Sequence, residues 1–235
     1  MFISFSGIDG AGKTTQIELL SSSLKKLGLA VRLISFWNDV ATLTRLREFA
    51  GYTIFRGDRG AGSPSAPVNR RDKNVHSPIM SAVRLCLYEL DSLSLRSTMM
   101  KAISDGGDAV VIFDRFIYDE LANLDFRNPV ARAYIRHVSA FVPSPHISFL
   151  LDADPEQARA RKPEYPIEFL RANREAYLAL GGLACAFTVI EPMPVDSVAR
   201  TVLQHVMNEL SPWYAWRDLN CQALSRFAAV EPPCR

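Results

Sequence analysis

The sequence predicts an α/β fold in which a five-stranded parallel sheet lies between two layers of helices. Short apolar runs alternate along the chain with longer segments that carry apolar residues at helical spacing. Residues 109–113 (AVVIF) and 147–151 (ISFLL) are almost entirely apolar, as parallel strands are when helices cover both faces. The repeated order of strand, helix and strand indicates βαβ units and therefore one parallel sheet.

The first predicted strand and helix enclose a glycine-rich loop. Residues 1–6 (MFISFS) form a short apolar run, and residues 7–15 read GIDGAGKTT. Leucine and isoleucine then recur at helical spacing from Ile17 to Leu27. Strand, glycine loop and helix in this order are the context in which G-x-x-x-x-G-K-[ST] predicts a phosphate site.

Glycine suits such a loop because successive backbone N–H groups must converge on one oxyanion, and a side chain would block the approach. The free N–H groups at the start of the helix add positive partial charge at the same place. We therefore expect Lys13 to reach the β- and γ-phosphates of ATP and the Thr14 hydroxyl to ligate Mg²⁺. The loop residues expected to contact ATP are Gly7, Asp9, Gly10, Ala11, Gly12, Lys13, Thr14 and Thr15.

The second and third strands bring further polar side chains to the same edge of the sheet. The predicted strand 31–36 is followed by Trp37, and the strand 109–113 is followed by Asp114 and Arg115. Open parallel sheets bind their ligands at the carboxyl ends of the strands. We expect Asp114 to hold Mg²⁺ through water.

A long irregular segment and a long helix separate these two strands. After a short helical stretch at 40–50, residues 51–76 are rich in Gly, Pro, Ser and charge, which predicts either an anion-binding loop or a solvated one. A helix over 77–104 follows, with Ser77 as N-cap and Pro78 at the first helical position. Its apolar stripe is predicted to consist of Ile79, Val83, Leu87, Leu90 and Met99.

The second half of the chain continues the alternation and ends in a tail. The predicted elements are a helix at 129–141, a strand at 147–151, a basic helix at 156–162, a helix at 167–180 stopped by Gly181-Gly182, a strand at 187–190 and a helix at 195–210. We expect one domain over 1–210 and a tail over 211–235, part of which packs.

Composition excludes several other classes of protein. The 235 residues are 48% hydrophobic and 22% charged, enough for a full core. The net charge of +2 is no nucleic-acid signature, and the four cysteines show neither zinc-site nor disulfide spacing. Because the predicted first strand starts at residue 1 and no apolar run approaches 18 residues, we expect neither a leader nor a membrane-spanning segment. We expect a cytoplasmic protein with neither nucleic-acid nor membrane partners.

The motifs together resemble those of the thymidylate kinase family, nucleoside-monophosphate kinases of the P-loop fold. Residues 7–16 look like the first motif of that family, Asp114-Arg115 looks like the second, and residues 150–161 look like the fourth strand and mobile lid. The resemblance covers residues 1–210. It implies a three-layer α/β/α P-loop kinase fold, with ATP and Mg²⁺ as cofactors and a nucleoside monophosphate, first of all dTMP, as acceptor.

The resemblance also implies roles for individual residues. Asp9 would meet the acceptor sugar, Arg115 would bind the acceptor phosphate, and Tyr88 on the long helix would stack on the base. Arg159 and Arg161 would clamp the transferred phosphoryl group. They lie in a lid at about 156–166, which also supplies the cation Lys162. Family members tend to dimerise through their middle helices, which implies a possible homodimer through helix 77–104.

The chain departs from the family pattern on the acceptor side. An arginine-bearing motif usually follows the second strand, where this chain has Trp37, which we place among the substrate-binding residues. The family also shows Asp-Arg or Asn-Arg one turn after the stacking aromatic, whereas this chain reads Asp91-Ser92, with Arg96 as the nearest cation. Two acceptor-side cations are therefore missing from their usual places.

Two other functions are compatible with the same loop. A nucleoside kinase would need a carboxylate to take the proton of the acceptor hydroxyl, and Asp114, Asp39 and Glu89 are candidates. A non-catalytic nucleotide-binding protein would signal through a partner, with the tryptophan-bearing tail as its interface. The lid arginines argue against this second alternative, because a binding protein has little use for a transition-state clamp.

Overall fold

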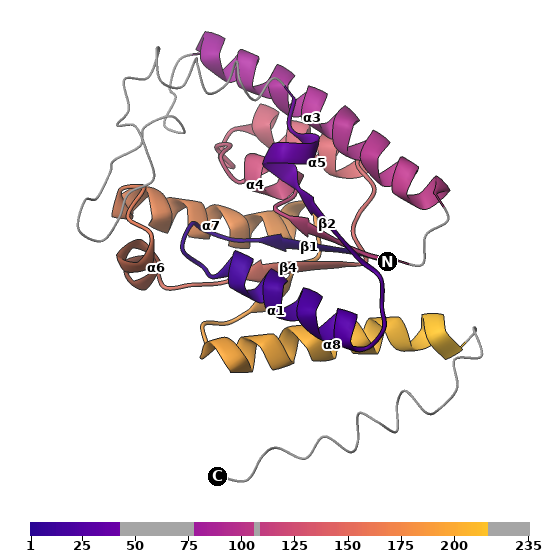
Figure 1. The fold of residues 1–235 in the computed structure, drawn as a ribbon. Helices are drawn as coiled ribbons and strands as arrows, with labels where there is room; N and C mark the ends of the chain where they lie inside the picture. The colour runs from indigo at the N-terminus through magenta and orange to yellow at the C-terminus, as the bar shows by residue number, and fades with distance from the viewer. Residues whose placement is uncertain (43–77, 106–108, 216–235) are drawn as a thin grey trace.

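The computed structural model describes residues 1–42, 78–105 and 109–215 (Figure 1). Its centre is one five-stranded sheet with the order β2-β3-β1-β4-β5, in which every neighbouring pair is parallel. The strands are β1 (Phe2–Ser6), β2 (Val31–Ser35), β3 (Val110–Asp114), β4 (Ile147–Leu151) and β5 (Thr188–Ile190). The predicted α/β fold with a five-stranded parallel sheet is confirmed.

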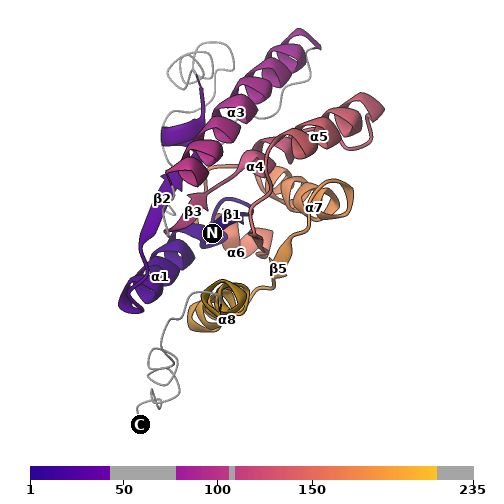
Figure 2. The same ribbon diagram turned by 90° about the vertical axis from the view of Figure 1, so that its right-hand side faces the viewer.

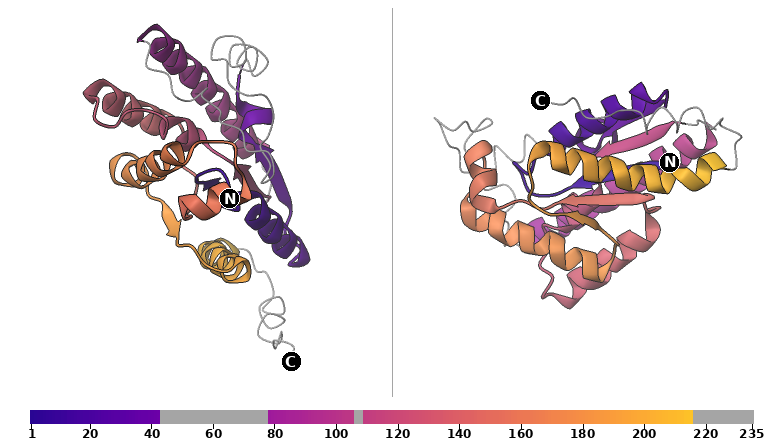
Figure 3. Two further views of the ribbon diagram at one scale, coloured as in Figure 1. Left: turned by 90° about the vertical axis from the view of Figure 1, so that its left-hand side faces the viewer. Right: turned by 90° about the horizontal axis from the view of Figure 1, so that it is seen from below.

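Helices cover both faces of the sheet, as the apolar strands predicted (Figure 2). Helices α1 (Lys13–Lys26) and α8 (Val195–Ala215) pack side by side on one face, which Figure 3 shows from below. Their buried side chains share a core with Ile3, Phe5 and Phe149 of the sheet. The opposite layer contains α3 (Pro78–Ser104), α4 (Ile117–Leu121), α5 (Pro129–Phe141) and α7 (Ile167–Leu183).

The strand register brings the polar strand ends to one edge of the sheet. Phe5 of β1 lies opposite Asp114 of β3, and Asp114 lies opposite Ser35 of β2. β1 therefore delivers its glycine loop beside the Asp114-Arg115 pair. This is the carboxyl edge, where ligands bind in open parallel sheets.

Several element boundaries differ from those that the sequence predicted. Helix α7 runs through Gly181-Gly182 to Leu183, because Leu180 is buried in the core and Leu183 packs against it, which keeps the last turn helical. The second strand ends at Ser35, and the next five residues form one π-helical turn, η1 (Phe36–Val40). The final helix extends beyond 210 to Ala215, and the short helix α4 was not predicted.

The predicted stripe on α3 divides between two faces. Met99 is buried against the core, together with Leu95, whereas Val83 is 46% exposed and Leu90 is 43% exposed. A helix that carries apolar residues on two sides cannot bury both against one sheet, so the prediction of one stripe that joins Val83 and Leu90 to Met99 was wrong. The predicted helix 40–50 beyond Thr42, the segment 51–76 and the tail from 216 lie outside the described residues.

Candidate active site

The glycine loop has the backbone of a phosphate cradle. Gly7, Gly10 and Gly12 all have positive φ, and Gly12 forms the left-handed N-cap of α1 without a side-chain hydrogen bond to that cap. The first amides of a helix have no intrahelical partners, so they point at any anion placed there. A Cβ added to Gly12 would meet no atom of the described residues within 4 Å, which leaves the approach open. The residues present therefore fit a bound phosphate.

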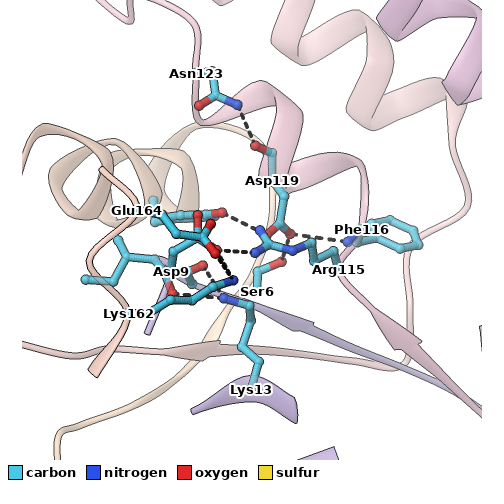
Figure 4. Close-up of polar contacts among 12 residues, drawn as sticks. Ser6, Asp9, Lys13, Arg115, Phe116, Asp119, Asn123, Lys162 and Glu164 are labelled. Atoms are coloured by element: carbon cyan, nitrogen blue, oxygen red, sulfur yellow. Dashed lines mark hydrogen bonds and ion pairs between the residues drawn. The ribbon is translucent and has the colours of Figure 1, made fainter. Parts of the chain in front are cut away.

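Lys13 is buried at the floor of this loop. Its side chain is folded back, and Nζ donates hydrogen bonds to the carbonyl oxygens of Gly7 (2.7 Å) and Ile8 (2.9 Å) (Figure 4). Burial lowers the pKa of Lys13 to about 7, the positive charge of Arg115 acts in the same direction, and the nearby carboxylates, Asp9 first among them, act against it. In the ligand-free protein, Lys13 therefore loses its proton far more readily than an exposed lysine does.

Arg115 lies at the end of β3, held by contacts to two other elements. It is the one non-glycine residue of the described chain with positive φ, at 68°, and its amide donates to the carbonyl oxygen of Phe5 (3.1 Å). Its guanidinium donates from one nitrogen to Asp9 and from the other to Asp119 (3.1 Å) (Figure 4). Burial alone would lower the pKa of Arg115, but the two carboxylates outweigh it and raise that pKa above its ordinary value.

Asp119, which the sequence analysis missed, accepts four hydrogen bonds in this site. It is 3% exposed and accepts hydrogen bonds from Ser6 Oγ (2.7 Å), Tyr177 Oη (2.8 Å), Arg115 and the Phe116 amide. The sequence offers one local signal, because a carboxylate three residues after an N-cap commonly accepts the amide of that cap. Of the other three partners, Ser6 and Tyr177 are far from Asp119 in the sequence, and Arg115 lies four residues before it.

Helix α6 (Pro155–Arg161) lies against the glycine loop. A Cβ on Gly10 would stand 2.2 Å from the carbonyl oxygen of Ala158, so the two backbones are in close contact. Beyond α6, Lys162 Nζ lies 3.3 Å from Glu164 and 3.9 Å from Asp9. The segment predicted as a lid is thus in direct contact with the loop.

Sequence comparison gives relatives that cover most of the chain. The probable thymidylate kinase of Methanothermobacter thermautotrophicus is 28% identical over 207 residues, which are 86% of this chain and 92% of the relative. The probable thymidylate kinase of Pyrococcus abyssi is 25% identical over 89% of this chain and 97% of its own. The thymidylate kinase of Prosthecochloris aestuarii is 32% identical over 69% of this chain and 64% of its own. No family model matches the chain.

Several curated thymidylate kinases, 25–32% identical over most of the chain, support its place in the thymidylate kinase family. Both family-like motifs, the glycine loop and Asp114-Arg115, meet in the structure at the carboxyl edge of the sheet, where Arg115 contacts Asp9. Arg161 is exposed and donates to the carbonyl oxygen of Gln157 (3.2 Å), and Arg159 is half-buried on the same helix.

The acceptor-side residues singled out in the sequence make the following contacts in the structure. Arg96, the nearest substitute for the missing cation, lies over the ring of Phe141 on α5 instead of the site. Asp91 is fully buried and accepts from the amide and hydroxyl of Thr42. Tyr88 is only 6% exposed, and Trp37 packs its ring edge-to-face on Phe36. Base stacking by Tyr88 and substrate contact by Trp37 stay predictions.

The site can accommodate Mg²⁺ that arrives with a nucleotide. Thr14 is exposed at the start of α1, and Asp114 is partly buried at the end of β3. Within the described residues, no three His, Cys, Asp or Glu side chains cluster as a metal site. One or two protein ligands suffice for Mg²⁺ bound to phosphates, so these two residues fit such an ion. None of the described helices is long and apolar enough to cross a membrane.

Proposed function

We propose that the protein is an ATP- and Mg²⁺-dependent kinase that transfers the γ-phosphoryl group to a nucleoside monophosphate, with dTMP as the first candidate. The observation that carries the proposal is the position of Arg115, which is held beside the glycine loop by Asp9 and Asp119. A cation fixed next to a phosphate loop can bring a second anion into line for transfer. The names of the relatives support the same activity.

The loop residues would bind ATP, and the metal would neutralise its charge. The amides at the start of α1 and the ammonium of Lys13 would bind the phosphates, from Gly7 to Thr15 along the loop. Thr14 and, through water, Asp114 would hold Mg²⁺. When bound, Mg²⁺ offsets the negative charge of the phosphate oxygens.

Arg115, Asp9 and the lid would act on the acceptor and on the phosphoryl group. Arg115 would bind the acceptor phosphate and Asp9 the acceptor sugar. Arg159 and Arg161 would neutralise charge that develops on the phosphoryl group, after residues 156–166 close over it and exclude water. Because a phosphate acceptor is already anionic at neutral pH, no strong base is needed.

A nucleoside acceptor is less well supported by the described residues. Of its three candidate bases, Asp39 accepts the Ser35 amide (2.7 Å) and Glu89 lies 3.3 Å from His137 on α5. Asp114 is the remaining candidate, and Arg115 beside it is better suited to an anion. A purely nucleotide-binding protein has no support in the relatives, which are named as kinases.

A panel of acceptors tests the proposal. ADP release from ATP is measured with dTMP, the other deoxynucleoside monophosphates and the corresponding nucleosides. We expect release with at least one monophosphate and none with nucleosides. Release only with nucleosides would replace the monophosphate proposal by a nucleoside kinase, and none with any acceptor would leave only nucleotide binding.

The lid proposal predicts a selective kinetic defect. Arg161→Ala should lower kcat by about 100-fold, because it removes a charge that acts in the transition state, and should change ATP affinity little. Arg200→Ala, an exposed arginine on α8, is the matched control and should leave kcat unchanged. A loss of ATP affinity with normal turnover would contradict the clamp.

We further propose that the protein forms a homodimer through α3, within the predicted helix 77–104. The large exposed apolar residues of this helix recur with the 3-4 spacing of a coiled-coil seam. They are Val83, Cys86, Leu90, Leu93, Met100 and Ile103. We call this set the α3 seam. Residues 1–210 would form the kinase domain, 211–235 a separate tail, and the protein would be cytoplasmic.

A further inference from the structure

Asp119 connects four parts of the site through one buried carboxylate. Oδ2 accepts from Ser6 Oγ at the end of β1 and from the Phe116 amide at the start of α4. Oδ1 accepts from Arg115 after β3 and from the Tyr177 hydroxyl on α7. Both oxygens are thus occupied by donors from four different segments, which fixes the orientation of the carboxylate.

The contacts of Asp119 act on both the side chain and the backbone of Arg115. The left-handed conformation of Arg115 is unfavourable for a residue with a Cβ, so its surroundings must hold it. Asp119 binds the next amide along, that of Phe116 (3.2 Å), and so anchors the peptide that follows Arg115. The same carboxylate binds the guanidinium at 3.1 Å.

The two carboxylates on Arg115 are not equivalent. Asp119 is 3% exposed and bonded on both oxygens, whereas Asp9 is 8% exposed, lies in the glycine loop and is also approached by Lys162. An incoming anion can exchange with Asp9 at one guanidinium nitrogen while Asp119 keeps the other. Asp119 is therefore the fixed anchor and Asp9 the exchangeable partner.

We propose that Asp119 is a positioning residue that aims Arg115 at the acceptor phosphate, with Tyr177 holding the carboxylate from α7. The proposal rests on the monophosphate-kinase function proposed above. In this proposal α7 covers the sheet and also holds the Asp119 carboxylate through Tyr177. Helix α7 is also joined to the lid helix α6 through the Arg171–Glu156 ion pair. Both α6 and, through Asp119, Arg115 are therefore attached to α7.

Steady-state kinetics separate positioning from stability. Asp119→Asn keeps the size of the side chain but removes the charge, and should raise KM for the monophosphate about 10-fold or more while KM for ATP changes less than about 2-fold. Asp152→Asn removes another mostly buried carboxylate, at the end of β4, which binds Arg174 of α7 instead of Arg115. This control should lower thermal stability without a selective change in the monophosphate KM. Equal changes in both KM values of Asp119→Asn, or none, would overturn the proposal.

A second variant covers the case in which Asp119→Asn does not fold. Tyr177→Phe removes only the hydroxyl that bonds Asp119 at 2.8 Å and leaves the aromatic ring in the core. The monophosphate KM should rise about 3-fold, as expected for one neutral donor to a carboxylate. An unchanged KM would show that Asp119 does not depend on α7.

An NMR measurement without substrate tests the contact between Arg115 and Asp119 independently of catalysis. In uniformly ¹⁵N-labelled protein, the Nη protons of Arg115, assigned by their loss in Arg115→Lys, should exchange slowly with water in the wild type. Exchange should be about 10-fold faster in Asp119→Asn or Tyr177→Phe, because burial and a charge-assisted hydrogen bond both protect these protons. Equal exchange rates would overturn the proposal even in an active enzyme. Slow exchange in an enzyme without monophosphate activity would refute only the proposed function.

Discussion

The cationic side chains of Lys13 and Arg115 lie near one another in a mostly buried site. Burial is the larger cause of the lowered pKa of Lys13, and the charge of Arg115 adds to it. In the ligand-free protein the folded state therefore binds fewer protons than the unfolded state between about pH 7 and the ordinary Lys pKa of 10.5. Lys13 consequently makes the folded state more stable as pH rises through that range.

Binding of ATP should reverse this effect on Lys13. The phosphate charge raises the pKa of Lys13, so ATP binding at about pH 8 should take up a fraction of a proton, and ATP affinity should fall as pH rises. Calorimetric titration in buffers of different ionisation enthalpy measures that uptake. Lys13→Gln should abolish it, whereas Lys26→Gln, an exposed control at the end of α1, should not. Proton release by the wild type would contradict the assignment of Lys13 to the phosphate site.

The glycine loop could be predicted from the sequence, because its glycines and lysine have fixed spacing between a strand and a helix. Arg115 could be predicted as a residue of the site, but not its left-handed backbone, since arginine has no preference for positive φ. The part played by Asp119 could not be predicted, because Ser6 and Tyr177 are far from it in sequence. The end of α7 was misjudged because packing overrode the low helix propensity of two glycines.

Two glycines of the loop should respond differently to the same substitution. Gly10 and Gly12 have nearly equal φ values, 85° and 89°, but a Cβ on Gly10 would collide with Ala158, and one on Gly12 would not. Gly12→Ala should lower the free energy of unfolding by about 1–2 kcal/mol from backbone strain alone. Gly10→Ala should lower it by about 2–5 kcal/mol, because displacement of α6 is added.

Chemical denaturation measures both values, and ATP titration adds a second comparison. Gly12→Ala should weaken ATP binding more strongly than its small loss of stability suggests, because its methyl group enters the space left for a phosphate. Equal destabilisation by the two variants would show that α6 does not rest on the loop in solution.

The whole molecule combines a sheet edge that carries the site with an outer helix that carries the α3 seam. The sequence pattern of α3 did not show which side of the helix faces the sheet, because α3 carries apolar residues on two sides. The packing of Leu95 and Met99 in the core shows which side it is. The remaining apolar surface is long and regular, as expected for a face that is covered in an assembly.

Disruption of the α3 seam should change the oligomeric state. Leu93, 49% exposed, lies in the middle of the seam. The wild type should be a dimer in size-exclusion chromatography with light scattering, and Leu93→Asp should be a monomer. Leu178→Asp is the control, because Leu178 is 42% exposed on α7 outside the seam and should leave the dimer intact. A wild-type monomer would refute the dimer without affecting the proposed chemistry.

Phosphoryl transfer in a single turnover tests the central proposal most directly. ATP labelled in its γ-phosphoryl group is mixed with excess enzyme and dTMP, and the label in the diphosphate product is followed over time. The wild type should move the label to the acceptor, and Lys13→Ala should do so at least about 100-fold more slowly while remaining folded. Transfer at the same rate by both proteins, or no transfer by the wild type to any monophosphate, would contradict the proposal.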